Sequence, residues 1–494
     1  MLLAIDQGTT GTTCLVFDLE GALAGRAYRE FTQHFPRPGW VEHDAAELWE
    51  VTRAVAVDAL ADAGVGEGEL AAIGITNQRE TVCAWDPASG EPLHRALVWQ
   101  DRRTARRCEE LRRAGHEPMV RERTGLVLDP YFSGTKIEWL LRNVDGLAQR
   151  AREGRAVFGT VDAWVVYNLT GEFATDATNA SRTLLCDIHR CAWDGDLLAM
   201  LGDIPERALP EIRPSCGSFG ATRAGALPGF DGVPVAGVAG DQQAALVGQA
   251  CLDPGQGKNT YGTGSFVLLN EGNTAPPAPE GLLTTIALQI GRRTTYALEA
   301  AIFVTGAGVQ WLRDGLGVIA RADETEALAA SLDTNDGVYF VPALTGLGSP
   351  HWDPYARGTI VGLTRGSTRA HLARATLEAI AYQTVDAVRA MEDVGAEPLR
   401  ELKADGGATV NAWLMQFQAD VLGTPVVVPE VAETTAFGAA SLAGVGAGVW
   451  TLDRVSKAWR ERARYEPKLD GTAREELLAG WRRALERARG WAAG

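Results

Sequence analysis

The chain has 494 residues, 46% hydrophobic and 22% charged, which is the composition of a globular protein able to bury large cores. Its formal net charge of −16 argues against nucleic acid as the main partner, because phosphate binding requires a basic surface. No apolar run reaches membrane-spanning length, Met1 leads directly into a strand, and the seven cysteines include no Cys-x-x-Cys pair. We therefore expect a cytoplasmic protein with reduced thiols, without stable membrane insertion, and with at least two domains.

The first predicted element is a hairpin, with apolar strands over 2–5 and 14–17 joined by a turn rich in Gly and Thr. Bare backbone N–H groups and Thr hydroxyls in such a turn can surround phosphate oxygens. On the turn alone, a plain hairpin of β-branched residues is the simpler interpretation. Asp6 shifts that balance, since a carboxylate at a strand end beside a phosphate loop suits hydrated Mg²⁺.

A helix follows with Asp44 as its predicted N-cap and Glu47 at the capping-box position. The next apolar strand, over 71–76, ends in Asn-Gln-Arg79-Glu80-Thr. Polar side chains at a strand end are typical of a site, and the Arg79 fork with the Glu80 oxygens suits vicinal hydroxyls. The alternative is a solvated turn containing a local ion pair.

Two aromatic residues follow strand or loop segments near this predicted site. Trp99 closes another strand, where its ring suits the carbon face of a small polyol, although a lone Trp is more often core. Tyr131 precedes an amphipathic helix, and its hydroxyl can reach a cleft. The polar run 179–182 is expected near the site, without an assigned role.

The middle of the chain repeats the pattern of its beginning. An apolar strand over 235–240 ends at Asp241 and leads into an Ala-rich helix. A strand, a Gly262-Thr-Gly turn and a second apolar strand then resemble the first hairpin, which predicts two similar halves with a cleft between them. The P-loop pattern fails, because Lys258 is followed by Asn and lacks the leading Gly.

In the last third, a long helix is predicted from Ser367 or Thr368 to a stop at Gly395. A strand over 399–404 then enters Asp-Gly-Gly-Ala at 405–408, before a helix from about Asn411. A Gly-Gly turn lets a planar base or a ribose approach the backbone closely, but an ordinary β–α turn explains it equally well. The Arg/Glu-rich end from Trp459 is predicted to be a solvated helix.

The three Gly turns together resemble the two phosphate motifs and the adenosine motif of the actin-like ATPase superfamily. Within it, the chain strongly resembles the FGGY carbohydrate kinases, whose two signatures fit the runs 131–140 and 358–378. The runs 75–81, 129–136 and 240–243 are similar to the versions found in members that phosphorylate glycerol. The resemblance extends from Leu3 to about Trp450.

The resemblance implies an α/β fold of two actin-like (ribonuclease H-like) domains, 1–246 and 247–494, each a mixed sheet flanked by helices, with a nucleotide and substrate cleft between them. It implies ATP-dependent phosphorylation of glycerol to sn-glycerol 3-phosphate, with Asp241 as general base, Mg²⁺ at Asp6 and Asp241, and a homo-oligomer (dimer or tetramer). The implied glycerol contacts are Arg79, Glu80, Trp99, Tyr131, Asp241, Gln242 and Phe266. The implied ATP contacts are Thr9, Thr10, Gly11, Thr263, Gly306, Gln310, Gly407 and Asn411.

The chain departs from the family in regions tied to phosphate binding and control. Thr12 and Thr13 stand where many relatives have an Arg after the first phosphate turn. The run 226–231 replaces the loop that binds fructose 1,6-bisphosphate in some relatives, and that region also lacks the His that others phosphorylate. Two other functions stay open, an FGGY kinase for another polyol or ketose and a non-kinase actin-like ATPase, although the latter has no need of an Arg-Glu pair facing Asp241.

Overall fold

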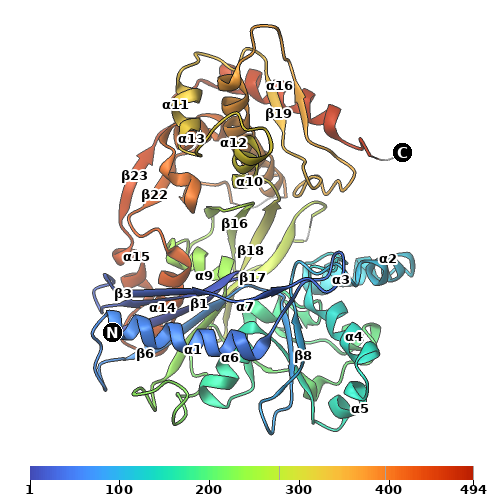
Figure 1. Cartoon of the computed structure of the whole chain (residues 1–494), viewed down its shortest axis with the longest axis vertical. Helices are drawn as coiled ribbons and strands as arrows, with labels where there is room; N and C mark the ends of the chain where they lie inside the picture. Colours follow the sequence, from blue (N-terminus) through green and yellow to red (C-terminus); the bar gives the residue numbers. More distant parts are fainter. Residues whose placement is uncertain (278, 395–396, 493–494) are drawn as a thin grey trace.

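Two mixed sheets form the frameworks of the two halves of the molecule (Figure 1). The computed structural model describes residues 1–277, 279–394 and 397–492. The N-terminal sheet, in strand order, is β14 (Val235–Gly240), β6 (Ala72–Asn77), β1 (Leu2–Gln7), β2 (Gly11–Phe17) and β3 (Leu23–Glu30). The C-terminal sheet, in strand order, is β17 (Leu283–Ile290), β18 (Arg293–Ile302), β16 (Ser265–Gly272), β15 (Gln256–Tyr261), β21 (Glu401–Asp405), β22 (Val426–Pro429) and β23 (Glu461–Tyr465).

The two sheets share one pairing pattern. β1 pairs antiparallel with β2 and parallel with β6, and β6 pairs parallel with β14. β15 likewise pairs antiparallel with β16 and parallel with β21, which pairs parallel with β22. The third strand of each meander is also antiparallel, β3 on β2 and β18 on β16. The prediction of two similar halves, each opened by a Gly/Thr hairpin, is confirmed.

Helices cover both faces of the N-terminal sheet because its central strands are apolar on both sides. α1 (Ala45–Asp62) and α6 (Val161–Thr170) cover one face, and α9 (Asp241–Gly248) and α14 (Thr434–Gly446) cover the other. α14 comes from late in the chain yet lies beside α9 (Figure 1). Gly248 and Gly438 let these two helices meet backbone to backbone, since a Cβ on either would collide with a carbonyl of the other helix.

α9 also contacts the C-terminal sheet, through a small core that includes Leu246, Leu268 and Ala297. The other face of that sheet carries the larger core, covered by α12 (Arg369–Glu392), α13 (Ala412–Leu422) and α16 (Gly471–Ala488). α9 therefore lies between the two halves, with its first residue at the cleft.

A second sheet of the N-terminal half carries the aromatic side of the site. In strand order it is β4 (Gln33–His34), β5 (Glu42–His43), β8 (Pro92–Leu97), β7 (Val82–Trp85) and β9 (Val157–Thr160). The helices beside it are α2 (Ala105–Arg113), α3 (Glu117–Thr124), α4 (Ser133–Asn143) and α5 (Leu147–Arg152). The remaining elements are α7 (Ala177–Ala180), α8 (Gly195–Met200), α10 (Gly306–Gln310), α11 (Glu324–Ala330), α15 (Leu452–Ala458), η1 (Glu206–Ala208), η2 (Trp311–Gly315), η3 (Gly407–Val410), β10 (Ala174–Asp176), β11 (Cys186–Asp187), β12 (Ala192–Trp193), β13 (Glu211–Arg213), β19 (Tyr339–Val341) and β20 (Thr359–Val361).

Several local predictions can be compared with the structure. Asp44 is the N-cap of α1, but the capping box is wrong, because the Glu47 carboxylate accepts hydrogen bonds from the backbone and hydroxyl of Thr32 instead. Thr368 is the N-cap of α12, and the predicted stop at Gly395 lies outside the described residues.

The predicted solvated helix from Trp459 is correct only in part, since the helix α16 forms but starts later and is not solvated on all sides. The segment first adds edge strand β23, and α16 then buries an apolar face that includes Trp481. Its charged composition hid that face, since only every third or fourth residue points inward. Within the described ranges, no helix has the length and apolar character needed to span a bilayer.

Candidate active site

Hydrogen bonds fix the conformation of the first Gly/Thr turn, between β1 and β2. Gly8 N–H donates to Gly11 O at 3.0 Å, and the Gln78 amide donates to Gly8 O at 2.9 Å. Thr12 donates its buried hydroxyl to Gln7 at 2.7 Å and so braces the turn. Thr10 stays exposed at the tip. The turn thus presents backbone and hydroxyl groups in a fixed arrangement, as phosphate binding requires.

The second turn, Gly262-Thr263-Gly264, is fastened to the start of α10. Gly306 N–H donates to Gly262 O at 3.1 Å, and Ala307 N–H donates to Thr263 O at 3.0 Å. A Cβ on Gly306 would lie 2.6 Å from Gly262 O, so only glycine permits this approach. The structure thus joins Thr263 and Gly306, which were predicted as separate ATP contacts, and leaves Gln310 of the same helix exposed.

The Gly-Gly turn after β21 lies beside the second turn, since β21 and β15 are parallel neighbours. Gly406 has φ of 90°, and a Cβ there would collide with Tyr261 O. Gly407 is exposed, with open space around the position of a Cβ. The Asn411 side chain caps α13 by accepting from Leu414 N–H at 2.9 Å. The turn therefore offers a bare, open backbone surface at the cleft.

Asp241 and Arg79 meet where β14 and β6 end side by side. Arg79 Nε lies 3.1 Å from Asp241 Oδ1, which also accepts from Gln242 N–H at 2.7 Å. The Asp241 side chain is 31% exposed, whereas Arg79 is buried. The other carboxylate oxygen, Oδ2, receives no hydrogen bond from any described residue and can accept a proton from a bound hydroxyl.

The predicted role of the Arg79 fork needs correction. Its two terminal nitrogens pair with the Glu299 carboxylate of β18, at 2.5 and 3.1 Å, and Nη1 also donates to Gln243 at 3.2 Å. Most N–H donors of the Arg79 guanidinium are therefore already hydrogen-bonded, and two vicinal hydroxyls cannot both bind its terminal nitrogens. The simple pairing failed as a prediction because Glu299 lies 220 positions away in the chain.

Glu80 is held in a strained backbone conformation, with φ of 63°, and its side chain is buried. Its Oε1 accepts from Arg182 Nε at 2.7 Å, and Arg182 Nη2 donates to Glu299 Oε1 at 2.9 Å. The polar run 179–182 thus does reach the site. Burial would raise the pKa of Glu299, but Arg182 and Arg79 lower it to about 2. For Glu80, burial outweighs the same two cations and raises the pKa.

Aromatic side chains form the wall of this pocket. The Trp99 and Tyr131 rings meet edge to face at 5.5 Å, and Arg79 lies 5.8 Å from the Phe266 ring. Buried Lys136 holds the Tyr131 loop by donating to the carbonyls of Pro130 at 2.5 Å and Tyr131 at 2.8 Å. These contacts place the aromatic rings predicted to line the polyol site beside one another or beside Arg79.

Lys258 is a cation that the sequence reading did not assign. It is fully buried, and its ammonium donates to Gln242 Oε1 and, at 2.9 Å, to Thr260 Oγ1. Burial lowers its pKa to about 8, against the opposing effect of Asp405 and Asp241. Of the charged residues that the sequence did not reveal, only Glu299 carries a signal, since it lies within the apolar run 296–302; Lys258 and Arg182 have polar neighbours in the chain.

The carboxylates of Asp6 and Asp241 are oxygen ligands of the kind that Mg²⁺ prefers. Burial and, to a smaller extent, the charge of Asp241 raise the pKa of Asp6 to about 7. No group of three or more metal-ligating side chains occurs in the described residues. Mg²⁺ bound with a nucleotide needs only one or two carboxylates, because phosphate and water oxygens complete its shell.

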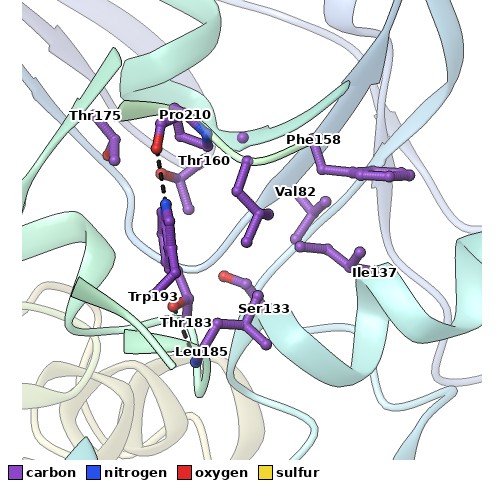
Figure 2. A pocket seen from close by; sticks show the side chains of 12 residues that line it. Val82, Ser133, Ile137, Phe158, Thr160, Thr175, Thr183, Leu185, Trp193 and Pro210 are labelled. Atoms are coloured by element: carbon purple, nitrogen blue, oxygen red, sulfur yellow. Dashed lines mark hydrogen bonds between the residues drawn. The ribbon is translucent and has the colours of Figure 1, made fainter. Parts of the chain in front are cut away.

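Two cavities lie outside this site. Figure 2 shows the side chains that line one of them, including Ser133, whose hydroxyl donates to Glu80 O. Its volume of about 10 Å³ is too small for a substrate. The other, of about 350 Å³, lies at the far end of α9 and is lined by residues such as Val247, Leu288 and Asp453. Neither cavity is lined by Arg79, Asp241 or the three Gly turns.

The matching strand pairing of the two half-sheets defines a two-domain α/β architecture. The models for the FGGY family of carbohydrate kinases match residues 1–248 (N-terminal domain) and 257–447 (C-terminal domain). The chain belongs to the FGGY family of carbohydrate kinases.

Relatives with a stated activity resemble the chain over nearly its full length. It is 54% identical to a glycerol kinase of Deinococcus radiodurans over 493 residues, covering 99% of this chain and 98% of the relative. The crystal structure of Plasmodium falciparum glycerol kinase with ADP is 36% identical, with a TM-score of 0.94 and coverage of 99% and 98%. A xylulose kinase from Rhodospirillum rubrum is 27% identical, with a TM-score of 0.85 and coverage of 98% of both chains.

Proposed function

We propose that this protein transfers the γ-phosphoryl group of ATP to glycerol, giving sn-glycerol 3-phosphate. The observation that carries the proposal is the pairing of Arg79 with Asp241 Oδ1, which leaves Oδ2 of a partly exposed carboxylate free at the cleft. The 54% identity to the Deinococcus glycerol kinase supports glycerol as the substrate.

In the proposed reaction, Asp241 accepts the proton of the terminal hydroxyl as its oxygen attacks the γ-phosphorus. Phosphoryl transfer passes through a loose transition state, so positioning and charge neutralisation supply most of the catalysis. The Glu80 carboxylate and the remaining Arg79 donor hold the other hydroxyls, while Trp99, Tyr131 and Phe266 cover the carbon atoms.

The nucleotide is assigned to the three turns. In the proposal, the phosphates are bound by the backbone and hydroxyls of Thr9, Thr10 and Gly11 and by the turn containing Thr263, which is bonded to Gly306 and Ala307 of α10. Gly407, Asn411 and Gln310 serve the adenosine. Asp6 and Asp241 would hold Mg²⁺, which, when bound, neutralises phosphate charge. Closure of the two halves would exclude water and limit ATP hydrolysis.

The test is a coupled assay of ADP release with glycerol, xylulose, gluconate and erythritol. We expect glycerol to give the highest kcat/KM by a wide margin. Preference for another compound would replace glycerol within the same reaction class. ATP turnover that ignores every added polyol would instead support a non-kinase actin-like ATPase.

Three further expectations belong to this proposal: a dimer or tetramer, a cytoplasmic location, and a division into domains 1–246 and 247–494. Light scattering and cell fractionation test the first two. Because α14 completes the core over the N-terminal sheet, we expect residues 1–246 expressed alone to be unstable, and stable when residues 434–458 are supplied.

A further inference from the structure

Four buried charges form a chain of ion pairs, which the 3.9 Å approach of Arg79 Nε to Glu80 Oε1 closes into a ring. This charge ring consists of Arg79, Glu80 and Arg182 from the N-terminal half and Glu299 from the C-terminal sheet. Each side chain is at most 1% exposed. Glu299 receives hydrogen bonds from both arginines, so it is the member through which the two halves meet.

The donor count of Arg79 shows what Glu299 does. A guanidinium has five N–H donors in one plane. Nη1 donates to Glu299 Oε2 and Gln243 Oε1, and Nη2 donates to Glu299 Oε1. The two-point contact with Glu299 fixes the plane of the guanidinium, because rotation would break both bonds. Nε then lies 3.1 Å from Asp241 Oδ1, and one Nη2 donor remains for substrate.

Arg182 performs the same task for Glu80. Its Nε holds Glu80 Oε1, and Nη2 ties Arg182 to Glu299. Glu80 Oε2 receives no hydrogen bond from the described residues, so this oxygen is left to accept one from a hydroxyl. The orientation of Glu80 thus depends on Glu299 through Arg182.

The ring is poorly suited to a purely stabilising role. Buried ion pairs commonly add little compared with well-packed apolar side chains. Here Nη1 of Arg182 is also buried without a hydrogen-bond partner among the described residues, an arrangement that costs stability. The function of the ring is therefore better explained by the orientation that it gives to the side chains of Arg79 and Glu80.

We infer that Glu299, acting through Arg79 and Arg182, is a positioning residue that sets the hydroxyl-binding geometry of the polyol pocket from the opposite half of the molecule. The inference rests on the proposed function of that pocket. Among the described residues, Glu299 accepts no hydrogen bond from the phosphate turns or the Gly-Gly turn, so its effect should fall on the polyol and not on the nucleotide.

The test compares Glu299→Gln with Glu378→Gln. Glu378 is a matched control: it is 1% exposed and accepts from Arg374 Nε at 2.8 Å, within the C-terminal half and away from the cleft. We expect Glu299→Gln to raise the KM for glycerol by about tenfold or more, since charge-assisted contacts are lost, with the KM for ATP within about twofold. Glu378→Gln should lower thermal stability to a similar extent but leave both KM values near those of the parent.

An unchanged KM for glycerol in Glu299→Gln, or equal changes in both variants, would overturn the inference. If Glu299→Gln does not fold, Arg182→Lys decides instead, because it keeps the charge but cannot bridge Glu80 and Glu299 in the same geometry. A raised KM for glycerol then supports the inference, and an unchanged one overturns it. The parent enzyme is assayed first, and its preferred polyol is then used for every variant. A failure of the proposed function therefore appears in the parent enzyme, separately from any effect of the variants.

Discussion

Trp99 Nε1 donates a hydrogen bond to Thr9 Oγ1 at 2.9 Å, and this bond joins the wall of the polyol pocket to the first phosphate turn. The backbone N–H of Trp99 is itself held by Thr81 Oγ1 at 3.1 Å, next to the Arg79–Glu80 pair. The indole is therefore fixed between the two substrate sites. A change at this ring should be felt at both.

Trp99→Phe keeps an aromatic face but removes the N–H donor. We expect the KM values for both glycerol and ATP to rise by roughly three- to tenfold, as for a lost neutral hydrogen bond of about 1 kcal/mol. Thr9→Val removes the same bond from the other side, so the double variant should show little additional loss for ATP. Initial-rate kinetics measure all three variants, and an effect of Trp99→Phe on glycerol alone would contradict the linkage.

Gly406 and Gly407 offer a matched pair for the adenosine turn. Gly407→Ala meets open space, so folding stability should change by less than about 0.5 kcal/mol, while the added methyl should obstruct the nucleotide and raise the KM for ATP. Gly406→Ala combines φ of 90° with a collision at Tyr261 O, and we expect it to destabilise the protein by at least about 1 kcal/mol. Thermal unfolding and ATP titrations separate the two effects. A Gly407→Ala enzyme with parental ATP affinity would remove that backbone from the nucleotide site.

Fructose 1,6-bisphosphate should have no measurable effect on the rate. In the run 226–231, the Asp231 carboxylate accepts from Gly225 N–H at 3.0 Å, which places a negative charge in the loop where a phosphate ligand would need a cation. Initial rates at millimolar effector measure this directly. Strong inhibition would reveal a bisphosphate site elsewhere on the molecule.

The sequence predicted those parts of the site whose signal is local. Gly/Thr turns and polar residues at strand ends can be recognised within a few residues, and their neighbours in space follow from the parallel pairing of β6 with β14 and of β15 with β21. The occupied fork of Arg79 could not be predicted, because its partner Glu299 comes from the other sheet. Lys258 was passed over for a similar reason: its partner Gln242 becomes a neighbour only when α9 packs against β15.

Asp162 gives a prediction for stability against pH. It is buried at the start of α6 and accepts hydroxyl hydrogen bonds from Thr160 at 2.5 Å and Thr175 at 2.6 Å, together with a backbone hydrogen bond from Ala163. Burial and the charge of Asp176 raise its pKa from 3.8 to about 7. Between these values the folded state holds a proton that the unfolded state has released, so the stability contributed by Asp162 falls as pH rises towards 7.

Asp162→Asn removes this titration. Relative to the parent, it should become more stable between pH 5.5 and pH 8 by about 2 kcal/mol, at about 1.4 kcal/mol per pKa unit. Urea unfolding at the two pH values measures the difference, with exposed Asp145→Asn as the control that should follow the parent. A parallel pH dependence in Asp162→Asn and the parent would show that Asp162 does not hold the proton.

Asp241→Asn tests the proposed chemistry most directly. The alternative is that Asp241 serves only as the N-cap of α9. In the structure the N-cap is Gly240, and α9 begins at Asp241, whose Oδ1 accepts a hydrogen bond from Gln242 N–H. Asn retains an oxygen for that bond and for a substrate hydroxyl, but it cannot take a proton. We expect kcat to fall by roughly 10²- to 10⁴-fold, the range for loss of a general base, with smaller changes in glycerol and ATP affinity. kcat and kcat/KM should fall together, as for a group that acts mainly in the transition state.

Asp44→Asn is the matched control, since Asp44 is the N-cap of α1 and Asn caps nearly as well, so that variant should keep parental turnover. If Asp241→Asn also stays within about threefold of the parental kcat, well short of the general-base range, Asp241 is only a structural residue at the start of α9 and another group must accept the proton.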